Sequence, residues 1–205
     1  DGGSARQLTS GNFNHYGSLA WSKDSQQIYF SAHRSEDWEL VSGESDIYAV
    51  NIASNELTQI TDQAGAESSP MISNDGKTLA FNHRVRRPLS YTPEHIAVMS
   101  LKTKKIMLLT EKLDGDASDF MWSQDDQSLY FAYQERGLQK LGNVTLDKKI
   151  TEITSSVGGT TIGRPYLSGS FHLSGDTIAY THGSSQRPAD IGVISSAGQI
   201  GRAHV

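Results

Sequence analysis

The chain has 205 residues, of which 23 are acidic and 18 basic, and its formal net charge is −5 at pH 7. This charge disfavours nonspecific attraction to nucleic acid or to an anionic membrane. Cysteine is absent, which excludes disulfides and thiol chemistry within the chain, and no apolar run approaches the length of a membrane span. We therefore expect no nucleic acid partner and no membrane insertion, and the compartment stays open between cytoplasm, periplasm and secretion.

The first nine residues resemble the end of a repeating unit. They finish with Leu8-Thr9, and later segments also finish with an apolar residue followed by threonine. We therefore expect residues 1–9 to be the turn and last strand of a preceding unit, the rest of which lies upstream.

A short phrase then recurs four times. Each copy has an apolar or aromatic residue, a serine and, two residues after the serine, an aspartate, and a short apolar strand follows. The four serines are separated by 51, 50 and 51 residues, a period typical of propeller or solenoid units. The copies are Trp21-Ser22-Lys23-Asp24 before Ile28–Phe30, Ile72-Ser73-Asn74-Asp75 before Leu79–Phe81, Trp122-Ser123-Gln124-Asp125 before Leu129–Phe131, and Leu173-Ser174-Gly175-Asp176 before Ile178–Tyr180.

Two further strand patterns follow the phrase. Alternating segments lie at residues 46–51, 95–100, 141–145 and 190–195, and beyond a polar turn further ones lie at residues 57–61, 106–110 and 150–154. Four short strands in about 50 residues are typical of a β-propeller blade, whereas a β-sandwich has no reason to repeat one phrase at fixed spacing. We therefore predict an all-β fold, a partial propeller over residues 1–199 that belongs to a larger seven- or eight-bladed ring. Its blades, about four in number, are anchored at Trp21, Ile72, Trp122 and Leu173.

The turn inside each phrase has its own chemistry. Ser73-Asn74-Asp75-Gly76 places an aspartate and a glycine where a tight hairpin needs a side-chain hydrogen bond to the backbone and a residue that tolerates positive φ. The other copies replace the glycine, so we expect their turns to be of a different type. Repetition of the aspartate indicates turn formation rather than acid–base catalysis. The predicted turn residues are Asp24, Asp75, Gly76, Asp125 and Asp176.

Loop length differs between the units. From the second to the third strand the distance is 17 and 15 residues in the first two units but 10 and 11 in the last two, and residues 155–166 form a long connection before the fourth unit. Because loops on one face of a rigid scaffold concentrate binding residues, we expect substrate or interdomain contacts there. The candidates are Arg34, Trp38, Arg84, Arg86, Arg87, Tyr91, Arg164 and Tyr166.

Two of these loops allow two interpretations. Residues 33–39 mix both charge signs with a tryptophan, and residues 84–91 combine three arginines with a proline and a tyrosine. Arginine could hold an acidic partner or a peptide carboxylate through two parallel hydrogen bonds. Alternatively, both are solvated loops whose charges pair locally.

Catalytic and metal-binding motifs do not emerge. A nucleophile elbow needs Gly-x-Ser-x-Gly, and residues 43–47 and 183–187 both lack the second glycine. The seven histidines show no metal-ligand spacing. We therefore expect no catalytic residue, no metal and no cofactor in this chain.

The last six residues, 200–205, match one reading frame of a common short-read sequencing adapter (ATCGGAAGAGCACACGTC). We therefore expect the natural sequence to stop near Gln199. Alternatively, these residues form an ordinary last strand, although they lack the Leu-Thr ending.

The strand patterns resemble a known set of repeats. The Trp-Ser-x-Asp strand, the Ile-Tyr-x-Val strand and the Leu-Thr ending are similar to the PD40 or WD40-like propeller repeats shared by TolB and by the prolyl oligopeptidase (S9) family of serine peptidases. Residues 87–99 with 109–110, 120–123 and 130–137 look most like the dipeptidyl and acylaminoacyl peptidase branch. The resemblance covers the chain to about Gln199.

This resemblance implies a two-domain enzyme. The propeller would cap a C-terminal α/β-hydrolase domain with a Ser-Asp-His triad and would act as a gate and size filter for short peptides. Its partners would be that hydrolase domain and the peptide substrates. The triad would lie beyond Val205, so no catalytic residue is carried over to this chain.

Two other functions stay open. One is a noncatalytic binding propeller of the TolB type, although its repeats usually carry Ser-Pro-Asp-Gly and no copy here has that proline. The other is a carbohydrate-active propeller, although the sialidase turn motif places its residues differently from residues 73–76.

Overall fold

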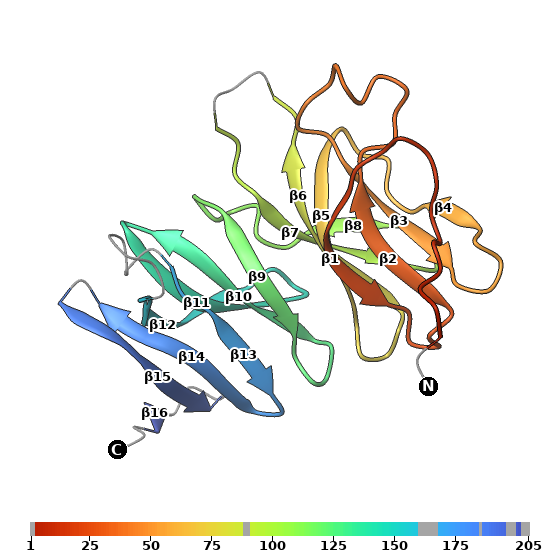
Figure 1. Ribbon diagram of the computed structural model, residues 1–205. Coiled ribbons are helices and arrows are strands. Elements are labelled where there is room, and N and C mark those ends of the chain that lie inside the picture. Colours follow the sequence, from red (N-terminus) through yellow and green to blue (C-terminus); the bar gives the residue numbers. More distant parts are fainter. Residues whose placement is uncertain (1–2, 88–90, 160–167, 185, 196–199, 202–205) are drawn as a thin grey trace. The chain divides into compact units, whose positions relative to one another are not determined.

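The computed structural model describes residues 3–87, 91–159, 168–184, 186–195 and 200–201, and its regular elements are β-strands (Figure 1). No helix capable of crossing a membrane occurs in this part of the chain. The strands are β1 His15–Trp21, β2 Gln27–Ala32, β3 Asp46–Asn51, β4 Leu57–Gln59, β5 Gly65–Ile72, β6 Thr78–Val85, β7 His95–Ser100, β8 Ile106–Leu108, β9 Ala117–Trp122, β10 Ser128–Glu135, β11 Leu138–Thr145, β12 Ile150–Val157, β13 Phe171–Ser174, β14 Thr177–Ser184, β15 Arg187–Ser195 and β16 Ile200–Gly201.

Within each repeat, strands that are neighbours in the sequence are neighbours in the sheet. One sheet has the order β1-β2-β3-β4, a second has the order β5-β6-β7-β8, and a third contains the eight strands β9 to β16. The contacts divide the chain into two compact units, residues 1–92 with 97–107 and residues 93–96 with 108–205. The prediction of an all-β chain built from four-stranded antiparallel sheets is confirmed.

The third sheet joins two repeats through a short contact between β12 and β14. β12 has eight residues, whereas the corresponding strands β4 and β8 have three each. Its extra length brings Val157 opposite His182 of β14 in an antiparallel pair, and the Gly158 N–H donates to the Thr181 carbonyl oxygen over 3.1 Å. These contacts connect the repeat of β9 to β12 with the repeat of β13 to β15. The last two repeats therefore form one continuous sheet.

The second strand of each of the first three repeats, and the third strand of the first two, carry runs of consecutive buried residues and form most of the core. In the fourth repeat burial alternates along β14, and β15 exposes Ile191 and Val193. In β2, Phe30 and Ala32 form a buried cluster with Tyr48 and Val50 of β3. The second unit has an equivalent cluster, built from Tyr130, Leu141, Val157, Ile178, Tyr180 and Ile194. The short apolar runs of the sequence are thus the interior of each sheet.

The first three phrase turns are copies of one another. In each, the serine hydroxyl donates to the aspartate, over 2.6 Å from Ser22 to Asp24 and 2.7 Å in the two later copies. The same serine oxygen accepts the backbone N–H five residues later, from Gln27, Thr78 and Ser128. Both bonds lie within the turn, so the phrase itself supplies the hydrogen bonds that shape it.

The expectation that these three turns differ in type was wrong. Ser25 and Asp126 adopt positive φ angles of 58° each, in the place where Gly76 has 79°. The polar network of the serine and the aspartate holds the backbone in this conformation, so a glycine is not required. The fourth turn does differ, because Ser174 pairs directly with Thr177 around a two-residue connection whose Gly175 has positive φ.

The threonine that follows the fourth strand closes the sheet. The Thr61 hydroxyl oxygen accepts the backbone N–H of Ile47 over 2.8 Å, and Thr110 accepts that of Ile96 over 2.9 Å. At the end of the hydrogen-bond ladder between the third and fourth strands, a side-chain oxygen thus takes the place of a backbone carbonyl oxygen. The backbone after the threonine can therefore turn away toward the next sheet.

The described part of the N-terminal segment does not form the predicted strand. Residues 3–9 have no regular structure, and Leu8 instead packs against the buried cluster of the first sheet. The order of that sheet, β1-β2-β3-β4, contains no strand from this segment. At the other end, Ile200–Gly201 form the short strand β16 beside β15, and residues 202–205 lie outside the described residues.

Candidate functional site

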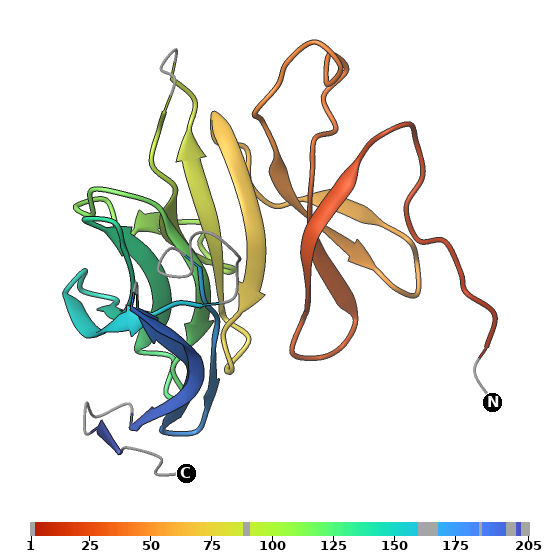
Figure 2. The same ribbon diagram turned by 60° about the vertical axis from the view of Figure 1, so that its left-hand side comes forward.

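The long connections of the first unit leave their sheets at the same end (Figure 1, Figure 2). The connection from β2 to β3 covers residues 33–45, and the one that follows β6 begins at residue 86. By contrast, only two residues separate β10 from β11, and two separate β14 from β15. The predicted inequality of the loops is present in the structure.

Arg34 is held by the segment before β1. Its guanidinium donates to the Ser10 carbonyl oxygen over 3.0 Å and lies 2.7 Å from His15 Nε2. The same group stacks over the Phe13 ring at 4.5 Å from the ring centre. Burial and the positive charge of Arg34 lower the pKa of His15. Arg34 therefore holds the connection between β2 and β3 against the segment that precedes β1.

Arg86 ties the two loops together. Its guanidinium forms an ion pair of 2.5 Å with Glu44, which lies just before β3. Its backbone N–H also donates to the Ala64 carbonyl oxygen over 3.4 Å, so the pair lies beside the connection into β5. Local charge pairing, one of the two interpretations of these loops, accounts for this arginine.

The remaining candidates have different exposures. Trp38 is half-buried in the turn at residues 36–40, whereas Arg84, Arg87 and Tyr91 are exposed. Arg164 and Tyr166 lie outside the described residues.

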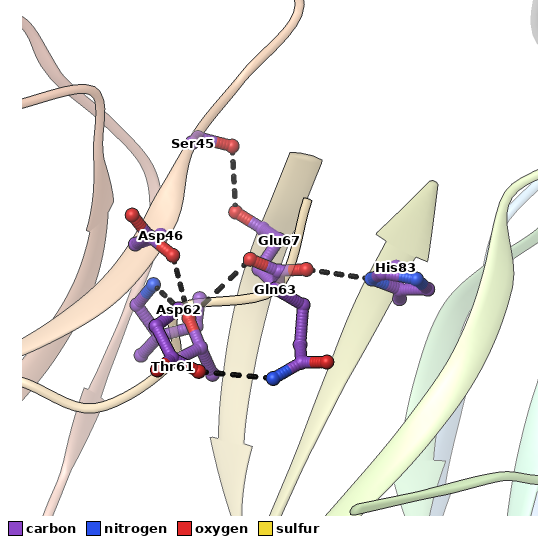
Figure 3. Close-up of polar contacts among 8 residues, drawn as sticks. Ser45, Asp46, Thr61, Asp62, Gln63, Glu67 and His83 are labelled. Atoms are coloured by element: carbon purple, nitrogen blue, oxygen red, sulfur yellow. Dashed lines mark hydrogen bonds and ion pairs between the residues drawn. The ribbon is translucent and has the colours of Figure 1, made fainter. Parts of the chain in front are cut away.

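A buried polar network lies where the first sheet meets the second (Figure 3). Ser45 and Ala66 form an isolated parallel bridge, in which the Ser45 N–H donates to Gly65 O and the Glu67 N–H to Ser45 O. The Ser45 hydroxyl also donates to the Glu67 carbonyl oxygen over 2.8 Å. The backbone at the start of β3 is thereby fastened to β5.

Three titratable side chains gather at this bridge. Glu67 on β5 is fully buried, and its Oε1 lies 2.6 Å from Nδ1 of His83, the residue opposite it on β6. The Thr61 hydroxyl lies 3.4 Å from Glu67 Oε2 and 3.4 Å from Asp46 Oδ1. One hydroxyl group thus stands between two carboxyl groups (Figure 3).

The electrostatics of Asp46 are unusual for an aspartate. Burial, followed by the negative charge of Glu67, raises its pKa from 3.8 to about 7. Asp46 in turn contributes, after burial, to raising the pKa of Tyr48 on the same strand. The cluster is therefore able to bind or release a proton near neutral pH.

Sequence reasoning missed Glu67 and His83. A signal was available in the repeat itself, because the corresponding residues fifty positions later are Ala117 and Tyr133, which face each other across β9 and β10. An acid and a histidine at positions where another copy carries alanine and tyrosine depart from the shared pattern.

The network does not supply a nucleophile. The Ser45 hydroxyl is committed to a carbonyl oxygen, and the His83 Nδ1 faces a carboxylate rather than a hydroxyl. Within the described ranges, no group of three or more acidic, histidine or cysteine side chains is arranged to hold a metal ion. The network is suited to linking the first sheet to the second through β3 and β5, and to binding a proton at Asp46.

The sheets and loops define the class of fold. The structure matches TolB from Acinetobacter baumannii with a TM-score of 0.65 and 18% sequence identity, over 94% of this chain and 44% of that one. The fold is a β-propeller of four-stranded antiparallel blades, of which this chain provides a part.

The sequence comparisons point to particular relatives. Residues 1–86 match the sequence model of the family described as the dipeptidyl peptidase IV (DPP IV) N-terminal region. Dipeptidyl-peptidase 5 of Porphyromonas gingivalis is 27% identical over 139 residues, which is 66% of this chain and 20% of that protein. The Tol-Pal system protein TolB of Francisella tularensis is 30% identical over 92 residues, 44% of this chain and 19% of that protein. The chain thus spans about a fifth of these relatives, and its resemblance to both groups is confirmed.

Proposed function

We propose that this chain is the propeller portion of a serine peptidase of the S9 type, which acts on short peptides as a dipeptidyl or acylaminoacyl peptidase. The match of residues 1–86 to the DPP IV N-terminal region carries the proposal. The similarity to dipeptidyl-peptidase 5, which extends over 139 residues, supports it. The catalytic triad belongs to a hydrolase domain outside residues 1–205.

In this proposal the propeller restricts which substrates reach the hydrolase domain. The elaborated connections of the first two blades stand at one end of the first unit, and the Arg86–Glu44 pair holds them together. Arg84, Arg87, Trp38 and Tyr91 provide cationic and aromatic side chains for a peptide carboxylate or for the hydrolase domain. The propeller selects substrates by size, because loops that are held in place by this ion pair leave less room for a folded protein than for a short peptide.

A second candidate function is a noncatalytic propeller that binds protein partners. The identity of 30% to TolB over 92 residues favours it. In this case the same loops contact a protein partner rather than a hydrolase domain.

The deciding experiment combines sequencing with an activity probe. The source DNA is read across codon 199 to the next stop codon, and the complete product is expressed and treated with a fluorophosphonate probe, which labels activated serines. A hydrolase domain with Gly-x-Ser-x-Gly, covalent labelling and cleavage of dipeptidyl or N-acetyl-aminoacyl p-nitroanilides are the expected results. A stop codon after further blades, with no labelling, would refute the peptidase proposal and leave the binding propeller.

A further inference from the structure

If Asp46 and Glu67 are both ionised, the buried network has one hydrogen too few for both carboxylates to receive a hydrogen bond at Thr61. The Thr61 hydroxyl has one hydrogen, yet it lies 3.4 Å from a carboxyl oxygen of Asp46 and 3.4 Å from one of Glu67. Its oxygen already accepts the N–H of Ile47. A hydroxyl donates one hydrogen bond, so it can serve only one of the two carboxylates.

The outer oxygens of the two acids show which one needs the extra proton. Glu67 Oε1 faces the His83 imidazole at 2.6 Å, whereas Asp46 Oδ2 receives only a neutral amide, from Gln59 at 3.0 Å. Of the two acids, Glu67 thus has the closer partner, and that partner is an imidazole rather than an amide. Asp46 completes the row of hydrogen bonds when it is protonated and donates to Thr61, which then donates to Glu67.

We propose that Asp46, Thr61 and Glu67 form a proton-binding site that fastens the first sheet to the second when it is occupied. On release, the proton passes from the Asp46 carboxyl group to water, and two carboxylates then flank one hydroxyl. Their repulsion acts on the start of β3, where Ser45 makes the bridge to β5. Proton loss therefore loosens the bridge, and the raised pKa of Asp46 places this change near neutral pH.

The surrounding charges do not replace the missing proton. Asp62, next to Thr61, raises the pKa of Asp46 further. The Glu44–Arg86 pair and the His15–Arg34 contact each use their cation locally. The titratable groups on the elements around the site include Asp46 and Tyr48 on β3, Asp62 before β5, Glu67 on β5, His83 and Arg84 on β6, His15 and Tyr16 on β1, Tyr29 on β2, and Arg34, Glu44 and Arg86 in the loops.

The second unit shows that a propeller bridge does not require such a site. There the Ala117 N–H donates to Glu94 O over 2.9 Å, as the Glu67 N–H donates to Ser45 O over 2.8 Å. The side chains at the positions of Glu67 and His83 are Ala117 and Tyr133. The same N–H to carbonyl bond is thus built without a carboxyl group at the position of Glu67, although the Glu94 N–H of this junction donates to Asp116 Oδ1 over 2.8 Å. The Ala117 amide is the internal control for the pair of Glu67 and Asp46.

The experiment has two measurements on the full chain between pH 4 and 9. Carboxyl ¹³C NMR follows the ionisation of Asp46, and hydrogen exchange, corrected for the intrinsic pH dependence of amides, follows protection at Ser45, Glu67 and Ala117. We expect Asp46 to titrate near pH 7 and protection at Ser45 and Glu67 to fall by about tenfold or more as the pH rises from 5.5 to 8.5. Protection at Ala117 should stay constant.

Two variants separate the site from general effects of pH. Asp46→Asn keeps the shape but cannot ionise, so protection at Ser45 should no longer change with pH. Asp125→Asn, the same exchange in an exposed turn, should leave the change intact. Titration of Asp46 near its ordinary value of about 4 overturns the proposal, as does an undiminished pH response in Asp46→Asn.

Discussion

Removing one half of the Glu67–His83 pair should destabilise the fold far more than exchanging both halves. Glu67 is 0% exposed and His83 is 8% exposed, and their atoms lie 2.6 Å apart. Glu67→Ala leaves the buried imidazole without its carboxylate, and losses of this kind cost roughly 3–5 kcal/mol. Loss of a charge-assisted hydrogen bond alone accounts for about 1.5–3 kcal/mol, and the cavity left by the shortened side chain adds to this.

The third repeat supplies the matched exchange. Ala117 faces Tyr133 in the register in which Glu67 faces His83, so Glu67→Ala combined with His83→Tyr installs a pair that the fold already accommodates. We expect the double variant to recover most of the loss and to unfold within about 1 kcal/mol of the parent, because replacing both members of a buried polar pair by well-packed side chains is commonly neutral.

Urea unfolding followed by tryptophan fluorescence measures all three proteins, with the slope of the free energy against urea checked for constancy. The reasoning fails if Glu67→Ala unfolds within about 0.5 kcal/mol of the parent, or if the double variant is no more stable than the single one.

Three further predictions concern the turns and the pH response. Ser73→Ala removes both a donor to Asp75 and the acceptor of the Thr78 N–H, so unfolding should become easier by about 1–2 kcal/mol in urea titrations. Asp126→Gly relieves a positive φ of 58° and should raise the free energy of unfolding by about 0.5–1 kcal/mol, whereas Gly76→Ala should lower it. Because the folded chain holds the Asp46 proton more tightly than the unfolded chain does, the stabilisation from this proton is complete below about pH 4 and is lost as the pH rises through about 7. Thermal melting of Asp46→Asn should show a smaller decline across that window, and an equal decline in both proteins would contradict this.

The strands and phrase turns were accessible from the sequence because their determinants are local. A serine and an aspartate two residues apart, such as Ser123 and Asp125, interact within one turn, and the short apolar runs mark the buried strands. The type of turn was not accessible at Asp126, because its positive φ depends on the completed hydrogen bonds rather than on its own preference.

The network of Asp46, Glu67 and His83 depends on register. Glu67 and His83 are sixteen residues apart, and the pairing between their strands shifts at a β-bulge between Ser68 and Met71. Asp46 belongs to another sheet altogether. Period-two alternation predicts which face of a strand is buried, but it does not identify the residue that stands opposite. The partners of Arg34 and Arg86 could not be predicted either, because they also lie far away in the sequence.

The threonine that closes each of the first two sheets has a consequence for how such chains diversify. Thr61 and Thr110 have the same scaffold task, yet only Thr61 stands between two carboxyl groups. The hydroxyl was already supplied by the scaffold, and acids at two nearby positions turn it into the centre of a titrating group. A duplicated unit can thus acquire chemistry that its siblings lack, through substitutions that leave the common architecture untouched.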